Sequence, residues 1–222
     1  MPGFPFDIVA FDLDGTLADT APDIAAGLNR MLADFGRAPL SEEVIRPMIG
    51  DGARNLIRKV LGATGEMTEA LVERAHPGYL DHYAAHVCEG TKIYPQVEMA
   101  LDALAARGVA LAICTNKPER TTSLLLAALG WTGRFAAIVG GDTLPWRKPD
   151  PRPLLETVAR AGGGRAAYVG DSIFDAETAR AAGLPFVAVS FGFRDRPVEA
   201  LGADAVIDSY EELIPALTWL AG

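Results

Sequence analysis

The stretch Phe6-Asp7-Ile8-Val9-Ala10-Phe11-Asp12-Leu13-Asp14-Gly15-Thr16-Leu17 decides the fold of this chain. Its apolar run 8–11 is short, continuous and rich in β-branched and aromatic residues, which predicts a strand buried in a sheet. Side chains alternate along a strand, so Asp12 and Asp14 begin on the same face. Two carboxylates at the end of a buried strand are unfavourable unless a cation lies near them. The stretch therefore predicts a metal or catalytic site at the end of a buried strand.

Composition narrows the classes of protein to which the chain can belong. It has 222 residues, of which half are hydrophobic, and this suggests one large domain or a domain with an insertion. The net charge of −9 argues against nucleic acid and anionic membranes as partners. Two cysteines make no disulfide framework, and neither a signal peptide nor a membrane span is evident. We expect a cytoplasmic monomer or homodimer that binds a small molecule.

Strand and helix patterns alternate through most of the chain. Apolar runs that predict strands lie at 8–11, 109–114, 135–139, 166–169, 186–189 and 205–207. Continuous apolar strands that alternate with helices predict an α/β fold with a doubly wound parallel sheet. Only helices are predicted between the first two strands, so residues 18–89 are interpreted as an inserted all-helical cap domain. Residues 1–17 and 90–222 then form the α/β core.

Polar residues follow four of the predicted strands. In open α/β sheets, ligands bind beyond the carboxyl ends of the strands. The polar segments are Asp12-Leu13-Asp14-Gly15-Thr16, Thr115-Asn116-Lys117-Pro118, Arg147-Lys148-Pro149-Asp150-Pro151, and Gly170-Asp171-Ser172 with Asp175. We therefore expect carboxylates, a hydroxyl, an amide and a lysine to meet at one edge of the sheet.

This order of residues resembles the haloacid dehalogenase superfamily of phosphohydrolases. The first of its four motifs matches residues 12–16, and the others match Thr115, Lys148, and Gly170-Asp171 with Asp175. The resemblance covers the whole chain, because the helical block lies where that family carries a helical cap. It implies a Rossmann-like core and the hydrolysis of a small phosphorylated metabolite.

The resemblance also implies roles for three aspartates. Asp12 would be the nucleophile and form an aspartyl-phosphate. Asp14 would protonate the leaving oxygen and then deprotonate the water that cleaves the intermediate. Mg²⁺ prefers oxygen ligands, and it would be held by the Asp12 carboxylate, the Asp14 main-chain carbonyl and Asp171.

The remaining motif residues would bind the phosphoryl group. By resemblance, Thr115 and the backbone or amide of Asn116 hold phosphoryl oxygens, and Lys148 neutralises the charge that spreads during transfer. Asp175 would be a ligand through water or a support for the metal site, although it could also simply cap the helix that follows. Lys117 could be a solvated lysine in a loop.

The predicted cap offers further candidates. The turn 50–53 leads into a helix N-terminus, which favours anions, and Arg54 lies in the first turn of that helix. We expect this turn and Arg54 to close over the substrate, although Arg54 could equally be a solvated surface residue. His82 and His86 have a spacing typical of metal ligands on a helix, but they lack a carboxylate partner at fixed spacing and are interpreted as surface residues.

Asp14 and the flanking segments narrow the choice within the superfamily. Dehalogenating members and ion-pumping ATPases lack this second aspartate, and a non-enzymatic phosphate sensor gains nothing from it. Segments such as Thr20-Ala21-Pro22-Asp23-Ile24 and Thr115-Asn116-Lys117-Pro118 resemble bacterial phosphoglycolate phosphatases. The expected reaction is the hydrolysis of 2-phosphoglycolate to glycolate and phosphate. A sugar-phosphate phosphatase, for example one acting on N-acetylmuramate 6-phosphate, and a phosphomutase similar to β-phosphoglucomutase remain alternatives.

Overall fold

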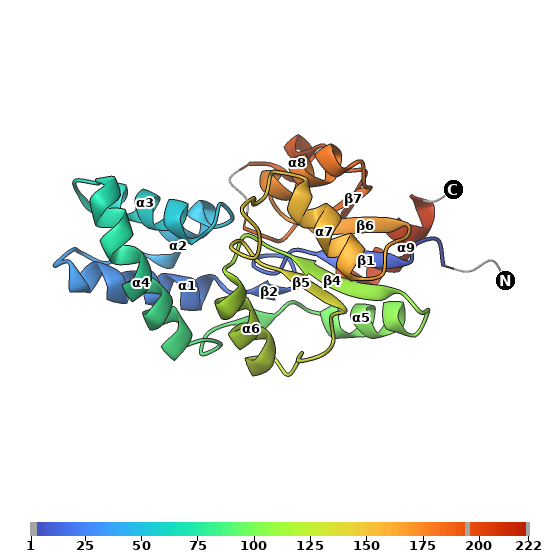
Figure 1. Ribbon diagram of the computed structural model, residues 1–222, viewed down its shortest axis with the longest axis horizontal. Coiled ribbons are helices and arrows are strands. Elements are labelled where there is room, and N and C mark those ends of the chain that lie inside the picture. The colour runs from blue at the N-terminus through green and yellow to red at the C-terminus, as the bar shows by residue number, and fades with distance from the viewer. Residues whose placement is uncertain (1–3, 194–195, 221–222) are drawn as a thin grey trace.

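A six-stranded sheet forms the centre of the molecule in the computed structural model, which describes residues 4–193 and 196–220 (Figure 1). The strand order is β5-β4-β1-β6-β7-β8, and every neighbouring pair is parallel. The strands are β1 (Ile8–Phe11), β4 (Ala110–Cys114), β5 (Ala137–Val139), β6 (Ala166–Gly170), β7 (Phe186–Val189) and β8 (Ala205–Ile207). The predicted doubly wound parallel sheet is confirmed.

Strand β1 lies in the middle of this sheet, between β4 and β6. Ile8 is in register with Ala110 on one side and with Ala166 on the other, and all of β1 is buried. The strand order runs outward from β1 in both directions, which is the arrangement that creates a ligand site in doubly wound folds. The carboxyl end of β1 therefore opens onto the point where such a site is expected.

Helices cover both faces of the sheet. They are α5 (Val97–Ala105), α6 (Glu119–Ala128) and α9 (Leu213–Trp219) on one face, and α7 (Arg152–Arg160) and α8 (Ile173–Ala182) on the other. Val9 and Phe11 belong to the buried cluster of the first face, whereas Ile8 and Ala10 belong to that of the second. Because alternate residues of a strand point to opposite faces, the apolar run 8–11 supplies side chains to both layers.

The chain builds a second group of helices between β1 and β4, at one end of the molecule (Figure 1). It comprises α1 (Ala21–Asp34), α2 (Glu42–Ile45), a 3₁₀ helix (Arg46–Met48), α3 (Ala53–Thr64) and α4 (Glu69–Ala85). Their apolar faces meet in a separate buried cluster, which includes Leu28, Leu32 and Val60 and is joined by Phe193 from the segment after β7. Further 3₁₀ helices at Val198–Leu201 and Tyr210–Glu212 belong to the sheet-containing part.

Two short strands that were not predicted lie where the chain enters and leaves the helical group. Strands β2 (Ala18–Asp19) and β3 (Lys92–Ile93) pair antiparallel and join this group to the rest of the molecule. They fall next to the predicted boundaries between the core, residues 1–17 and 90–222, and the cap, residues 18–89. The division of the chain into these two domains stays a prediction.

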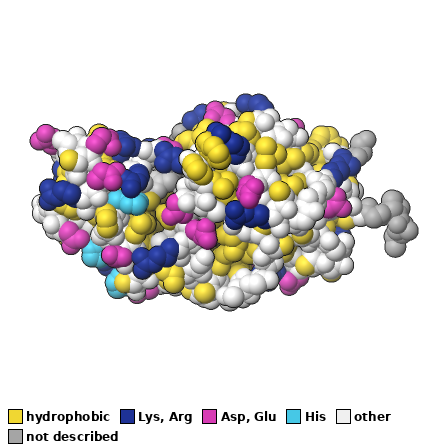
Figure 2. Space-filling model, viewed as in Figure 1, with side chains coloured by type: hydrophobic (Ala, Val, Ile, Leu, Met, Phe, Trp, Pro, Cys, Tyr) yellow, Lys and Arg dark blue, Asp and Glu magenta, His cyan; other side chains and the backbone are white. Residues whose placement is uncertain are grey.

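Charged side chains of both signs lie on the surface (Figure 2). Figure 2 shows acidic and basic side chains interspersed on one face, without a broad basic area on that face. In the described part of the chain, no helix combines the length and the apolar character needed to cross a bilayer.

Candidate active site

The ends of three neighbouring strands bring most of the predicted site residues together. Asp12 and Asp14 follow β1, Thr115 and Asn116 follow β4, and Asp171 follows β6. Lys148 reaches the same place from the loop between β5 and α7, and Asp175 lies in the first turn of α8. The convergence predicted from the strand ends is thus present.

Lys148 lies between two buried carboxylates. Its Nζ is 2.9 Å from Asp12 Oδ1 and 2.6 Å from Asp175 Oδ1, and all three side chains are almost fully buried. Burial opposes the charge of Lys148, but Asp12 and Asp175 outweigh it and raise the pKa of the ammonium. Burial also raises the pKa of the Asp12 carboxyl to about 6, although Lys148 opposes the rise. The lysine therefore supplies the cation that two carboxylates in this place require.

Asp175 caps α8, as considered from the sequence, and it also holds Lys148, while its role at a metal site stays a prediction. Its Oδ2 accepts hydrogen bonds from the backbone N–H groups of Asp171 and Ser172, and Ser172 Oγ completes a capping box. Its Oδ1 accepts from Lys148 Nζ at 2.6 Å and from the Tyr168 hydroxyl at 2.8 Å. The Lys148 charge and these hydrogen bonds outweigh the effect of burial and lower the pKa of Asp175. Both carboxylate oxygens are therefore occupied by protein donors.

Asp171 is held beneath the glycine turn that follows β1. Its Oδ1 accepts a hydrogen bond from Thr16 Oγ1 at 3.3 Å, and its Oδ2 accepts from the Phe193 backbone N–H at 2.5 Å. Gly15 has a φ of +82°, and a Cβ at this position would collide with the Asp171 carboxylate. Burial, together with the charges of Asp175 and Asp12, raises the pKa of Asp171 well above its usual range.

The residues at this site fit a divalent cation. One carboxylate oxygen from each of Asp12, Asp171 and Asp175 lies within 4.8 Å of the others, and all three side chains are buried. Asp12 Oδ1 accepts no hydrogen bond within the described part of the chain, despite its ionic contact with Lys148. Three buried carboxylates around one lysine leave negative charge uncompensated, and oxygen donors of this kind suit a hard cation. Among the described residues, each oxygen of Asp175 accepts two or more hydrogen bonds, whereas each oxygen of Asp171 accepts one, so Asp12 and Asp171 are the carboxylates with more free capacity.

Asp14 contacts Lys117, which the sequence analysis considered as a solvated loop residue. Lys117 Nζ lies 3.1 Å from Asp14 Oδ1 and 3.2 Å from Oδ2, and Thr20 Oγ1 donates to Oδ1 at 2.7 Å. Lys117 is 7% exposed, so it is not the solvated loop residue that its position suggested. It is covered by Tyr83 of α4, whose ring centroid lies 4.2 Å from Nζ. This contact joins residues more than thirty positions apart, and no local signal in the sequence could have revealed it.

Thr115 and Asn116 lie on the rim of the same site. Thr115 Oγ1 accepts a hydrogen bond from the Lys117 backbone N–H, which leaves its own hydroxyl proton for another acceptor. The Asn116 amide bridges the Lys148 backbone and the Gly50 carbonyl oxygen, so it joins the Lys148 loop to the turn before α3. The amide is thereby engaged in the fold, and the backbone N–H of Asn116 is the better candidate for a phosphoryl oxygen.

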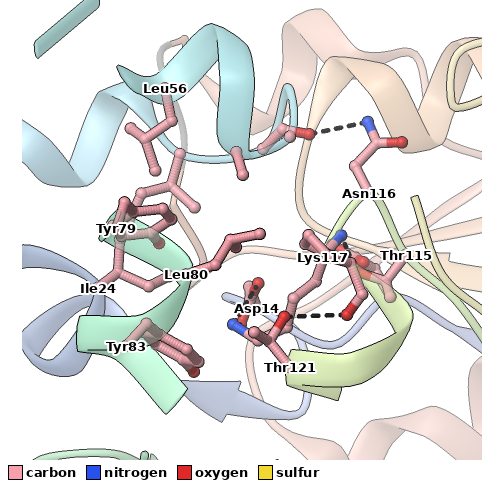
Figure 3. Close-up of a pocket in the computed structure, with 16 residues that line it drawn as sticks. Asp14, Ile24, Leu56, Tyr79, Leu80, Tyr83, Thr115, Asn116, Lys117 and Thr121 are labelled. Atoms are coloured by element: carbon pink, nitrogen blue, oxygen red, sulfur yellow. Dashed lines mark hydrogen bonds and ion pairs between the residues drawn. The ribbon is translucent and has the colours of Figure 1, made fainter. Parts of the chain in front are cut away.

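A pocket lies between the sheet edge and the helical group. Figure 3 shows Leu56, Tyr79 and Leu80 on the helical side facing Thr115, Asn116 and Lys117 across this space, with Asp14 at its base. The lining residues are Asp12, Asp14, Ile24, Ile49, Gly50, Gly52, Ala53, Leu56, Tyr79, Leu80, Tyr83, Thr115, Asn116, Lys117, Pro118 and Thr121. The pocket is therefore lined both by Asp12, the predicted nucleophile, and by side chains of the helices between β1 and β4.

Arg54 lies apart from this pocket. Its guanidinium is exposed and forms an ion pair with Glu73 of α4, and the turn before α3 lines the pocket through Gly50, Gly52 and Ala53 instead. His82 pairs with Asp34 and His86 with Glu89, so the two histidines contact different acids near the surface. The substrate-binding role of Arg54 stays an untested prediction.

Comparison with known proteins agrees with this geometry. Residues 9–189 match the model of the haloacid dehalogenase-like hydrolase family. The chain belongs to this family. A phosphoglycolate phosphatase of Agrobacterium fabrum is 42% identical over 95% of this chain and 91% of its own length. One from Mesorhizobium japonicum is 44% identical over 93% of this chain and 92% of its own length.

A solved structure has the same fold as this chain. A predicted phosphoglycolate phosphatase from Haemophilus somnus superposes with a TM-score of 0.89 and 30% sequence identity, over 95% of this chain and 97% of its own. The predicted Rossmann-like core is thereby confirmed. With the family match and these relatives, the predicted enzyme class is also confirmed, and the chain is a hydrolase of phosphoric monoesters.

Proposed function

We propose that this enzyme hydrolyses 2-phosphoglycolate to glycolate and phosphate, with Mg²⁺ and through a phosphate ester of Asp12. The observation that carries the proposal is the Asp12 carboxylate. It lies at the end of the central strand, it lines the pocket, and the Lys148 ammonium 2.9 Å from its Oδ1 favours its ionised form. The relatives named phosphoglycolate phosphatase support the choice of substrate.

The proposed reaction has two steps. In the first, a carboxylate oxygen of Asp12 attacks phosphorus, the bond between phosphorus and the ester oxygen breaks, and Asp14 gives a proton to the departing glycolate oxygen. In the second, Asp14 takes a proton from a water molecule that attacks the phosphorus of the aspartyl-phosphate. Phosphate leaves, and the Asp12 carboxylate is restored.

The surrounding residues have complementary roles in this proposal. Mg²⁺ would be held by the Asp12 carboxylate, the Asp14 main-chain carbonyl and Asp171, and it would reduce the repulsion between the phosphate dianion and the attacking carboxylate. Lys148 keeps Asp12 ionised and neutralises charge on the phosphoryl group. The Thr115 hydroxyl and the backbone N–H of Asn116 donate hydrogen bonds to phosphoryl oxygens.

The character of the pocket supports a small substrate over a sugar phosphate. On the helical side its lining is mostly apolar, with Ile24, Leu56 and Leu80, and the tyrosines Tyr79 and Tyr83 supply hydroxyl groups there. A sugar would lose water from several hydroxyl groups and find few partners for them, which costs binding energy. The phosphatase acting on a sugar phosphate and the phosphomutase are therefore less well supported.

The test is phosphate release from a panel of esters, with Mg²⁺ and with a chelator. The panel contains 2-phosphoglycolate, N-acetylmuramate 6-phosphate, glucose 6-phosphate and p-nitrophenyl phosphate. The proposal expects the highest kcat/KM for 2-phosphoglycolate and loss of activity with the chelator. Equal rates with and without the chelator would contradict the metal requirement, and an isomeric sugar phosphate as product would indicate a mutase. An Arg54→Ala variant measured on the same panel tests that residue, whose predicted role requires a lower kcat/KM for 2-phosphoglycolate.

A further inference from the structure

The lysine beside Asp14 is the cation of the substrate pocket. Among the described residues that line this pocket, Lys117 alone carries a positive charge, whereas Asp12 and Asp14 are both acidic. The other lysine of the site, Lys148, is already engaged by Asp12 and Asp175. A substrate with an anionic group in addition to its phosphate therefore has one cationic side chain available to it in this pocket.

The surroundings of Lys117 keep its side chain inside the pocket. Its carbonyl oxygen accepts a hydrogen bond from the Gly141 backbone N–H at 2.8 Å, and its own N–H is bonded to Thr115. On the helical side the Tyr83 ring covers the ammonium, and the Tyr83 hydroxyl is buried without a hydrogen-bond partner in the described part of the chain. Desolvation of an ammonium is unfavourable, and Asp14 compensates for it in part, so a further acceptor that reaches Nζ in this buried place stabilises the charge.

The ammonium retains capacity for another acceptor. A lysine carries three N–H donors, and the hydrogen bonds assigned to Nζ are made to the single carboxylate of Asp14. An anion entering the pocket can therefore contact Nζ while Asp14 stays in place.

The position of Asp14 fixes which anion Lys117 can reach. In the proposed reaction, on which this inference rests, Asp14 protonates the ester oxygen of the leaving group. Lys117 Nζ lies 3.1 Å from the nearer oxygen of Asp14. An acidic group attached one carbon away from the ester oxygen would then lie beside Nζ, whereas an acidic group at the far end of a long substrate would not.

We propose that Lys117 is a specificity-determining residue that binds a carboxylate one carbon away from the ester oxygen of the substrate. The residue favours 2-phosphoglycolate and closely related phosphorylated hydroxy acids. It discriminates against neutral esters of the same size, since these leave the buried ammonium without its second partner.

The test compares two esters that differ in one charge. They are 2-phosphoglycolate and its carboxamide, 2-amino-2-oxoethyl phosphate. The measured quantity is the ratio of kcat/KM for the two esters, in which any common effect of a variant on Asp14 cancels. In Lys117→Met this ratio should fall about 10- to 100-fold, mainly through a higher KM for 2-phosphoglycolate. Lys117→Arg keeps the charge and should retain most of the preference.

Lys59→Met is the matched control, because Lys59 is an exposed lysine of α3 that lies outside the pocket. The control should leave the ratio unchanged, and circular dichroism establishes that each variant is folded. A wild-type enzyme that hydrolyses both esters equally would contradict both this inference and the choice of substrate. If the wild type prefers 2-phosphoglycolate and folded Lys117→Met retains that preference, the inference alone is wrong. The inference alone is also wrong if Lys117→Arg loses the preference as completely as Lys117→Met.

Discussion

Removing the charge of Lys148 should destabilise the protein more than any surface substitution. In Lys148→Met the carboxylates of Asp12 and Asp175 lose the ammonium that lies 2.9 Å and 2.6 Å from them. At an effective dielectric constant of about 20, each contact contributes about 6 kcal/mol of Coulomb energy, most of which offsets the desolvation of the charges. Loss of one partner from a buried pair leaves the other charge uncompensated, at a cost of about 3–5 kcal/mol. The free energy of unfolding in chelator at pH 7 should fall by this amount.

The assay is urea denaturation followed by circular dichroism, with Lys59→Met as the control. Lys59 is exposed and forms no ion pair in the described part of the chain, so its substitution should change the free energy of unfolding by less than about 0.5 kcal/mol. Asp175→Asn removes one of the two charges that Lys148 compensates. The double variant Lys148→Met/Asp175→Asn should therefore lose less stability than the sum of the single variants. A loss below about 1 kcal/mol in Lys148→Met, or strict additivity in the double variant, would refute the electrostatic argument.

Three further substitutions probe neighbouring groups. In chelator, burial holds the pKa of Asp12 at about 6, above its unfolded value of about 4, so its contribution to stability is lost as the pH rises through 6. Asp12→Asn should accordingly be more stable than the wild type by about 1–3 kcal/mol at pH 7 and equally stable near pH 4, as urea titrations at several pH values can measure. Asp14→Asn should lower kcat/KM, which reports the first step, about 10²- to 10⁴-fold on alkyl esters and much less on p-nitrophenyl phosphate, whose leaving group needs no proton; kcat should fall on both esters because Asp14 also activates the water of the second step, and equal losses of kcat/KM would contradict its role as the acid. Ser172→Ala breaks the capping box of α8 and should cost about 0.5–2 kcal/mol in urea denaturation, and no measurable cost would argue against that cap.

The sheet and the catalytic edge were predictable because their signals are local. The run 8–11 is apolar on both faces, and polar residues follow directly at Asp12 and Asp14. In a parallel sheet these strand ends must lie on one edge, so spacing along the chain translates into proximity in space. Strands β2 and β3 escaped prediction because two-residue strands carry no periodic pattern and form only when distant segments meet.

The environment of side chains that depend on distant elements was not predictable. Lys117 follows a strand like many solvated lysines, and its burial depends on Tyr83 of α4 and on its contact with Asp14. Arg54 lies beside the turn that lines the pocket, but its side chain turns toward Glu73. The spacing of residues along the sequence could not predict the orientation of the Lys117 or Arg54 side chain, because each orientation depends on how the helices between β1 and β4 pack.

The most direct test of the proposed mechanism is to trap the phosphorylated enzyme. Wild-type protein is mixed with 2-phosphoglycolate and Mg²⁺, quenched in acid within the first turnovers, and digested for mass spectrometry. The mechanism predicts a peptide that contains Asp12 and is heavier by the mass of one phosphoryl group, and it predicts no such peptide from Asp12→Asn. A phosphorylated peptide that lacks Asp12, or phosphate release by Asp12→Asn at the wild-type rate, would contradict the assignment of Asp12 as the nucleophile.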